Sequence, residues 1–337
     1  MKSILVDSYG RQIDTLRISL TDACNFRCVY CMPQEGLPAF LPPSNYLTRG
    51  EIVRFVRLAG TLGIARLRLT GGEPLLRKDI VDIVRDLKQI KTVRDLSITT
   101  NASLLQPLLR PLREAGLDRL NISLDSLDPK RFQSVTFSDA YKEVIHAVSQ
   151  ALEEEFPVKL NIVAIQGLEE EEINRFVKLA IGNDLEVRFL EFMPLCGTSW
   201  RPDLVIPIGK IRDTVLRNFD LEEEERFPGQ VAQTFRMKLG KGKVGFIGSL
   251  TESFCNDCSR MRMTADGRIR PCLFSDTEVA TGSLLRNKAS DEEIIESIRL
   301  AAAIKPKGNH FRENPFDPSE DSELHLEGLP LIRSIGG

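Results

Sequence analysis

The chain has 337 residues, 42% of them hydrophobic, and is therefore long enough to bury one large core or two ordinary ones. Its formal net charge of −3 argues against a general nucleic-acid binder, which would carry a large basic excess. The sequence has no positively charged start followed by an apolar segment and no apolar run of membrane-spanning length, so we expect neither export nor a membrane anchor, and the cytosol is the expected compartment.

Short β-type segments alternate with amphipathic helical stretches from residue 15 to about residue 220. Strands are expected at 15–20, 66–70, 95–100, 119–124, 157–164 and 186–192. A capping box, Thr48-Arg49-Gly50-Glu51, opens the first helix. Later helices are expected at 79–90, 104–115, 140–155, 169–182 and 207–219. Regular βα alternation predicts a parallel sheet with right-handed crossovers, and six units are two fewer than a complete TIM barrel.

The loop after the first strand carries Cys24, Cys28 and Cys31 at the spacing CxxxCxxC. Three thiolates can hold three irons of a cubane cluster and leave the fourth iron open, as a catalytic site requires. A zinc knuckle or three unrelated buried thiols are the alternatives. Zinc would need a fourth ligand, and the nearest histidine in sequence is His146.

The expected strands alternate apolar and polar side chains, whereas parallel strands buried on both faces would be nearly continuous apolar runs. Since the helices must cover the apolar set, the polar set should line the inside of a curved, partly open barrel. The cations of that interior would be Arg17, Arg66, Arg68, Lys159 and Arg188. Such an interior cannot be dry and empty, so we expect a multiply charged anionic ligand there. The carboxylates that could pair with some of these cations instead are Glu73, Asp125, Glu186 and Glu191.

The remaining motifs of this half follow the strands, where a barrel carries its chemistry. Gly71-Gly72-Glu73-Pro74 comes after the second strand; its glycines allow close backbone approach to a ligand, and Glu73 can pair with a cation such as an amino group. The third, fourth and sixth strands end in Thr99-Thr100-Asn101, Ser123-Leu124-Asp125 and Glu191-Phe192-Met193.

The composition changes near residue 220, with an acidic run at 222–225 followed by Gly-rich and strand-like pieces. We therefore expect an α/β fold in two parts: a partial (β/α)6 TIM-like barrel over 1–220 and a smaller C-terminal α+β domain over 221–337. The second part carries another triplet, Cys255, Cys258 and Cys272, flanked by arginines. A missing fourth cysteine again favours a cluster with a vacant iron beside an anionic ligand, and zinc completed by a histidine is the alternative.

These motifs resemble the radical S-adenosylmethionine (SAM) enzymes and, within them, the GTP 3′,8-cyclase family of molybdenum-cofactor biosynthesis. The resemblance covers essentially the whole chain and rests on the first triplet followed by Met-Pro, on Gly-Gly-Glu-Pro, on the second triplet with Arg260-Met261-Arg262, and on the terminal Gly336-Gly337. It implies two [4Fe-4S] clusters, with SAM on the first and GTP between them. Reductive cleavage of SAM would give a 5′-deoxyadenosyl radical that takes the C3′ hydrogen of GTP, after which C3′ closes onto C8.

The resemblance also implies roles for individual residues. The first cluster would be held by Cys24, Cys28 and Cys31, and the second by Cys255, Cys258 and Cys272. SAM would be contacted by Tyr30, Gly72, Ser123 and Met193. GTP would be contacted by Arg17, Arg68, Thr99, Lys159, Arg260 and Arg262, of which Arg17, Arg260 and Arg262 would also take part in catalysis. Two places depart from the family pattern: Ala102 stands where glycine usually follows Thr-Thr-Asn, and the loop Phe137-Ser138-Asp139 lacks its common glycine.

The partners implied are GTP, SAM, an electron donor and a downstream enzyme that takes the cyclised product; no nucleic acid or membrane is expected, and a homodimer is left open. Two other functions compete with this one. A radical SAM enzyme that modifies a peptide would also carry an auxiliary cluster, but usually with more C-terminal cysteines. A non-enzymatic iron–sulfur or zinc-binding protein would need neither the Gly-Gly-Glu-Pro segment nor the polar strand faces.

Overall fold

Eleven strands form one curved sheet in the computed structural model, which describes residues 4–32, 39–195 and 198–308. Its centre consists of six parallel strands in chain order: β1 (Thr15–Ser19), β2 (Arg66–Thr70), β3 (Asp95–Thr100), β4 (Arg119–Ser123), β5 (Val158–Ala164) and β6 (Leu185–Glu191). Each lies within one residue of the range expected from the sequence. The parallel βα centre is therefore confirmed.

The residues after 220 extend both edges of this sheet. Next to β6 lie β9 (Lys243–Ile247), which is parallel to it, then the antiparallel β8 (Gln233–Met237) and β7 (Leu221–Glu223). At the other edge β10 (Arg260–Met263) pairs in parallel with β1, and β11 (Ile269–Arg270) pairs antiparallel with β10. The order runs from β11 to β7 without closing, so the sheet is a partial barrel. The division into two domains at residue 220 stays a prediction.

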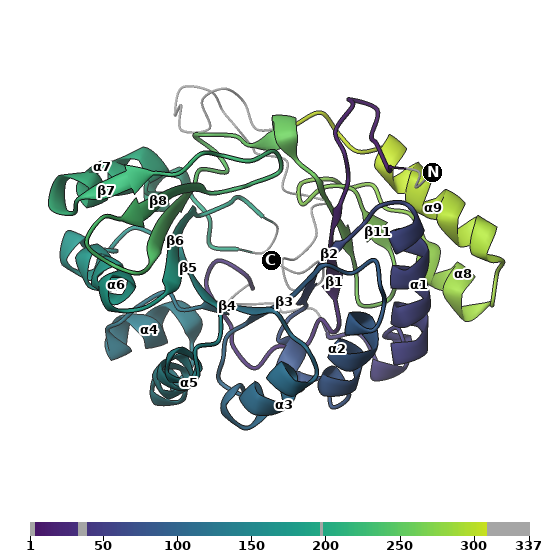
Figure 1. Ribbon diagram of the computed structural model, residues 1–337, viewed down its shortest axis with the longest axis horizontal. Helices are drawn as coiled ribbons and strands as arrows, with labels where there is room; N and C mark the ends of the chain where they lie inside the picture. Colours follow the sequence, from purple (N-terminus) through teal and green to yellow (C-terminus); the bar gives the residue numbers. More distant parts are fainter. Residues whose placement is uncertain (1–3, 33–38, 196–197, 309–337) are drawn as a thin grey trace.

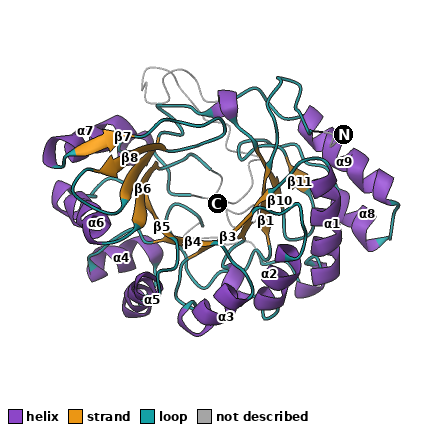
Figure 2. Ribbon diagram, viewed as in Figure 1, coloured by secondary structure: helices purple, strands orange, loops and turns teal. Residues whose placement is uncertain are grey.

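Helices cover the outer face of the sheet (Figures 1 and 2). Their bounds are α1 (Arg49–Thr61), α2 (Ile80–Lys88), α3 (Leu109–Glu114), α4 (Pro129–Thr136), α5 (Tyr141–Glu153), α6 (Glu170–Gly182), α7 (Ile208–Asn218), α8 (Thr281–Arg286) and α9 (Asp291–Ala303). The expected capping box begins α1: the Thr48 nitrogen donates to the Glu51 carboxylate over 2.7 Å, and the Glu51 nitrogen donates to the Thr48 hydroxyl over 3.3 Å. Among the described helices, none has the length and apolarity that crossing a membrane would take.

Within residues 1–220 two helices differ from the sequence prediction, and α8 and α9 lie after residue 220, where no helix is predicted. The helix expected at 104–115 begins only at Leu109, after a 3₁₀ turn over Gln106–Leu108. An earlier start would place Pro111 in the helix interior, where its nitrogen could not donate; a start at Leu109 leaves it in the first turn, where no donor is needed. Helix α4 is absent from the sequence prediction, although Asp128 caps it and Pro129 occupies its first position.

The alternation along the strands separates the core from the inside of the barrel. On β5, Leu160 and Ile162 are fully buried under the helices, whereas Lys159 and Asn161, which alternate with them, are half-buried on the opposite face. The same pattern holds along β6 from Leu185 to Phe189, after which Leu190 lines the cavity and the buried Glu191 lies on the outer face. Because strand residues two apart share a face, the apolar set packs against the helices and the polar set faces inward, as expected.

Candidate active site

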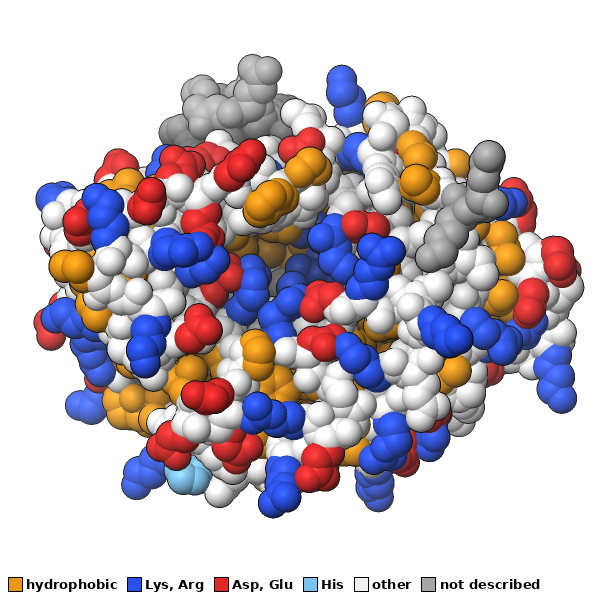
Figure 3. Space-filling view, viewed as in Figure 1, with side chains coloured by type: hydrophobic (Ala, Val, Ile, Leu, Met, Phe, Trp, Pro, Cys, Tyr) orange, Lys and Arg blue, Asp and Glu red, His pale blue; other side chains and the backbone are white. Residues whose placement is uncertain are grey.

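A cavity of about 580 Å³ opens on the inner face of the sheet, and the six cysteines of both triplets line it. A volume of this size is typical of a small-molecule site. The space-filling view shows a central hollow with Lys and Arg side chains gathered inside it (Figure 3). The basic residues that line the cavity are Arg17, Arg66, Arg68, Arg119, Arg188, Arg260, Arg262 and Lys305. A net-acidic chain thus concentrates positive charge at one place.

The first triplet lies in the loop that follows β1. All three residues are half-buried and none forms a disulfide. The nitrogens of Cys31 and Met32 donate to the carbonyl oxygen of Cys28 over 2.9 and 3.0 Å, which makes a tight turn, and the Phe26 nitrogen donates to the Cys24 sulfur over 3.4 Å. Burial raises the pKa of the Cys24 thiol to about 11 and that of Cys28 well above its usual value. Such thiols become ligands when a metal displaces their proton.

The donors fit an iron–sulfur cluster. Within the described ranges, no three His, Cys, Asp or Glu side chains are placed to hold a metal ion. A [4Fe-4S] cluster does not need donors that converge on one point, because each thiolate binds a different iron. Each cysteine triplet lies on the wall of one shared cavity. Three ligands would leave the fourth iron of each cluster for another molecule.

The Gly71-Gly72-Glu73-Pro74 segment packs directly on the first cysteine loop. The nitrogens of Gly72 and Glu73 each donate over 2.8 Å, to the carbonyl oxygens of Thr21 and Ala23. A Cβ on Gly72 would overlap the Ala23 oxygen and lie 2.7 Å from that of Asp22. The close backbone approach expected of these glycines is therefore made to the cysteine loop.

Glu73 joins the loops that follow β2 and β3. Its carboxylate is 1% exposed and accepts hydrogen bonds from the Thr100 hydroxyl and the Asn101 nitrogen, both over 2.7 Å, and from the Leu75 nitrogen over 3.0 Å. Burial raises its pKa to about 7 in spite of these donors. A cation beside it would favour the charged form, which agrees with the expected contact to an amino group.

A second buried carboxylate joins the cysteine loop to β5. The Tyr30 hydroxyl donates to Asp125 over 2.7 Å, and the Val163 nitrogen donates to the other oxygen of Asp125 over 2.9 Å. Burial raises the pKa of Asp125 to about 6. All four residues expected to contact SAM, namely Tyr30, Gly72, Ser123 and Met193, line the cavity.

The second triplet lies in a more basic environment than the first. The guanidinium of Arg260 donates to the Cys258 sulfur over 3.6 Å and stacks over the Phe254 ring at 4.7 Å. Although burial opposes ionisation, Arg260 and Lys305 lower the pKa of the Cys258 thiol to about 6. The pairing of β10 with β1 brings this region to the first half of the chain, because Arg17 lies opposite Arg262 on one side and Arg68 on the other.

These arginines repel one another in the ligand-free cavity. Burial and the neighbouring Arg262, Arg68 and Arg260 hold the pKa of Arg17 well below its usual value. Burial and nearby arginines also lower the pKa of Arg68 to about 9 and that of Arg262 to about 10. Neither Arg17 nor Arg68 has an ion pair or hydrogen bond among the residues that the structure describes. Their charges remain available to an anion.

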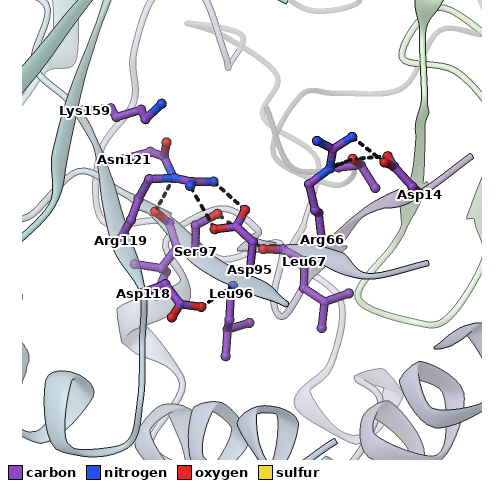
Figure 4. Close-up of polar contacts among 12 residues, drawn as sticks. Asp14, Arg66, Leu67, Asp95, Leu96, Ser97, Asp118, Arg119, Asn121 and Lys159 are labelled. Carbon is purple, nitrogen blue, oxygen red and sulfur yellow. Dashed lines mark hydrogen bonds and ion pairs between the residues drawn. The ribbon is translucent and has the colours of Figure 1, made fainter. Parts of the chain in front are cut away.

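Other cations of the lumen are already paired (Figure 4). Arg119 binds Asp95 through two contacts of 2.7 and 2.8 Å, and Arg66 pairs with Asp14. Sequence reasoning missed Asp14, Asp95 and Arg119, although Asp95 and Arg119 are the first residues of β3 and β4 and share the inner face with Ser97 and Asn121 by the period of two.

One carboxylate on β6 serves two cations. Lys159 contacts Glu186 over 2.6 Å, and Arg188 pairs with the same carboxylate. Burial and Arg188 nevertheless lower the pKa of Lys159 to about 8, so its pairing with Glu186 only partly offsets the cost of burying its charge. Of the four carboxylates expected as partners, Glu186 is the one that pairs with an expected lumen cation in the described structure. Glu191 instead accepts from the nitrogens of Ile208, Leu250 and Thr251.

Every residue given a site role from the sequence lines the cavity except Lys159, which lies beside Glu186. The terminal Gly336-Gly337 and the unassigned Cys196 lie outside the described residues. Residues that line the cavity but have no role from the sequence include Phe254 and Lys305. Lys305 carries no motif of its own, and only its position in the fold reveals it.

Two family models match consecutive parts of the chain, the Radical SAM superfamily over residues 18–180 and Molybdenum Cofactor Synthesis C over residues 185–311. The GTP 3′,8-cyclase of Listeria welshimeri is 45% identical over 312 residues, which cover 91% of this chain and 92% of that protein. That of Thermodesulfovibrio yellowstonii is 40% identical over 317 residues, 93% of this chain and 98% of the other. Human Molybdenum cofactor biosynthesis protein 1 is 41% identical over 307 residues, 90% of this chain but 48% of the human protein.

Among solved structures, Streptococcus suis SuiB bound to S-adenosylmethionine has a TM-score of 0.61 at 16% identity, covering 86% of this chain and 69% of SuiB. That likeness concerns the fold. The sequence matches are closer, since they reach 40–45% identity along nearly the whole length of bacterial relatives that carry one name. The chain belongs to the GTP 3′,8-cyclase family of the radical SAM superfamily.

Proposed function

We propose that this protein is a GTP 3′,8-cyclase, a radical SAM lyase that converts GTP into (8S)-3′,8-cyclo-7,8-dihydroguanosine 5′-triphosphate in the first step of molybdopterin biosynthesis. The observation that carries the proposal is the single cavity lined by both cysteine triplets and by the arginines between them. Neither alternative is favoured, because the bacterial relatives at 40–45% identity are GTP 3′,8-cyclases rather than peptide-modifying enzymes or electron carriers.

The first triplet holds a [4Fe-4S] cluster and the second triplet holds another. When bound, the first cluster and SAM supply the 5′-deoxyadenosyl radical that takes the C3′ hydrogen of GTP. The residues proposed to contact SAM are Tyr30, Gly72, Ser123 and Met193, which line the same cavity as the first triplet. Their task is to fix the position of the radical, since a reactive group only slightly out of place reacts elsewhere.

The arginines and Lys159 bind GTP. Arg17 and Arg68 have charge available for the triphosphate, and Lys159 and Thr99 contribute from neighbouring strands. Arg260 and Arg262 lie between the second triplet and Arg17 and hold the nucleotide near that cluster. We assign Arg17, Arg260 and Arg262 to catalysis because the ribose must lie between the two clusters.

Three further features belong to this proposal. A separate donor supplies the electron for SAM cleavage, and a separate enzyme of the pathway takes the cyclised nucleotide. The reaction takes place in the cytoplasm. The formation of a homodimer stays open.

The test is anaerobic incubation of the reconstituted protein with SAM, a reductant and GTP, with 5′-deoxyadenosine and cyclised nucleotide measured together. Cys24→Ser should abolish both products, whereas Cys272→Ser should spare uncoupled formation of 5′-deoxyadenosine and lose the cyclised nucleotide. Cys196→Ser, outside both triplets, is the control and should retain both. Equal loss of both products in a folded Cys272→Ser protein would contradict the division of labour, and wild-type protein that forms no cyclised nucleotide would overturn the function.

A further inference from the structure

We propose that Lys305 is a positioning residue of the second cluster site, which fastens two of its three cysteine segments and supplies a fixed positive charge beside them. The proposal rests on the proposed function to the extent that the second triplet holds a [4Fe-4S] cluster. Lys305 comes two residues after α9, the last helix among the described residues, and none of the sequence motifs includes it.

The contacts of Lys305 reach both sides of the triplet. The residue is 3% exposed and lines the cavity. Its ammonium donates to the carbonyl oxygen of Arg260 over 2.8 Å and to that of Pro271 over 2.7 Å. Arg260 lies two residues after Cys258, and Pro271 directly precedes Cys272. One side chain therefore sets the distance between the segments that carry these two cysteines.

The third cysteine segment is fastened by a second cation, from the other end of the described chain. Arg11 is buried and pairs with Asp7 over 2.6 Å. Its guanidinium also donates to the carbonyl oxygens of Cys255 and Lys307, both over 2.8 Å, and to that of Pro306 over 2.6 Å. Arg11 thus holds Cys255 and the residues that follow Lys305, so the two cations together reach all three cysteine segments.

The charge of Lys305 needs an explanation beyond packing. A buried ammonium is costly unless an anion compensates it, and a hydrophobic residue of similar size would pack as well. In the described structure its hydrogen-bond partners are two neutral carbonyl groups, and burial lowers the pKa of the ammonium. The thiolates of Cys258 and Cys272 act against that shift, whereas Arg260 and Arg11 add to it. A cluster with three thiolate ligands supplies a lasting negative charge at this place, and a nearby cation favours its reduced, more negative form.

The experiment uses a protein that lacks the ligands of the first cluster, so that only the second cluster is measured, and it changes the charge of the side chain at position 305. In a full-length Cys24→Ser, Cys28→Ser, Cys31→Ser parent, iron content and midpoint potential are measured without GTP for Lys305→Met and Lys305→Arg. Lys305→Met should shift the reduction equilibrium at least about tenfold toward the oxidised form, which is about 59 mV for one electron. Lys305→Arg keeps the charge and should stay within about threefold of the parent. Arg54→Met is the control, because Arg54 also binds a backbone carbonyl, that of Ala289, but lies outside the cavity lining.

The possible results distinguish a failure of the role of Lys305 from a failure of the second cluster. If Lys305→Met loses the cluster iron while Lys305→Arg retains it, the positioning role is supported. Where Lys305→Met does not fold, Lys305→Gln replaces it with the same expectations. A Lys305→Met protein with the potential and iron of the parent would overturn the role of Lys305, as would equal shifts in the Met and Arg variants. A parent that binds no iron would instead overturn the second cluster and the proposed function.

Discussion

Two non-glycine residues adopt left-handed backbone conformations where the family pattern has, or commonly has, glycine. Ala102 has a φ of 62° and Phe137, which ends α4, has a φ of 51°. A residue with a Cβ pays about 1–2 kcal/mol for this conformation relative to the right-handed one. Ala102 and Phe137 therefore keep the left-handed backbone conformation that glycine adopts easily, and each adds strain to the fold.

Replacement of Ala102 by glycine is expected to change the free energy of unfolding by less than about 1 kcal/mol, because relief of the left-handed strain offsets the loss of one buried methyl group, about 0.8 kcal/mol. The same relief also offsets the extra freedom that glycine gives the unfolded chain, about 0.4–1 kcal/mol. The measurement is urea denaturation of the cluster-free protein. Ala147→Gly is the control, since Ala147 is equally buried, at 1% exposure, but lies inside α5; it should lower stability by about 1 kcal/mol or more. Similar losses in both variants would show that Ala102 carries no strain.

At the scale of elements, the sequence predicted the central strands well because their alternation is local. A period of two shows where a strand runs and which face is polar, and the capping box marks the start of α1. The same reasoning identified both cysteine triplets from their spacing. The predicted start of α3 is five residues too early, because the apolar pattern continues across Pro107 and Pro111, which cannot donate a hydrogen bond inside a helix.

What the sequence could not provide is the neighbour of each strand. Consecutive strands usually lie side by side, but β10 pairs with β1 although about 240 residues separate them. That pairing brings Arg260 and Arg262 to Arg17 and unites the two triplets in one cavity. The contacts of Lys305 and the pair of Asp95 with Arg119 also join segments that are distant in the sequence, so no local sequence pattern predicts them.

The Gly-Gly-Glu-Pro loop should act through the first cysteine loop as much as through a ligand. In Gly72→Ala the new methyl group would overlap the Ala23 carbonyl and force the two loops apart. We expect this variant to lose the first cluster and keep the second, hence to retain about half of the iron and to cleave no SAM. Iron analysis and 5′-deoxyadenosine formation measure both effects.

Gly182→Ala is the matched control for this change, because a Cβ at Gly182 meets nothing within 4 Å. That variant should keep its full iron content and SAM cleavage. A Gly72→Ala protein with full iron but weakened SAM binding would show that Gly72 serves the ligand and not the cysteine loop.

At the scale of the whole molecule, the sheet collects more positive than negative charge on its inner face. Strands from both parts of the chain contribute, since β1 and β2 supply Arg17 and Arg68 and β10 supplies Arg260 and Arg262. The cations that have carboxylate partners are held in place, whereas Arg17 and Arg68 have none among the described residues. The fold therefore holds an anion site at the expense of its own stability, a common compromise at functional sites.

The removal of an arginine that has no carboxylate partner and the removal of one that has such a partner should have opposite effects on the stability of the protein. Arg68→Met is expected to stabilise the cluster-free, ligand-free protein by on the order of 1–3 kcal/mol, because burial and neighbouring arginines already disfavour its charge. Arg119→Met should destabilise it, because Asp95 then loses its partner. Urea denaturation with and without tripolyphosphate measures both: the anion should stabilise the wild type more than Arg68→Met. Equal destabilisation by the two substitutions would show that Arg68 is held by the protein itself, and that its charge is not kept available for the triphosphate of GTP.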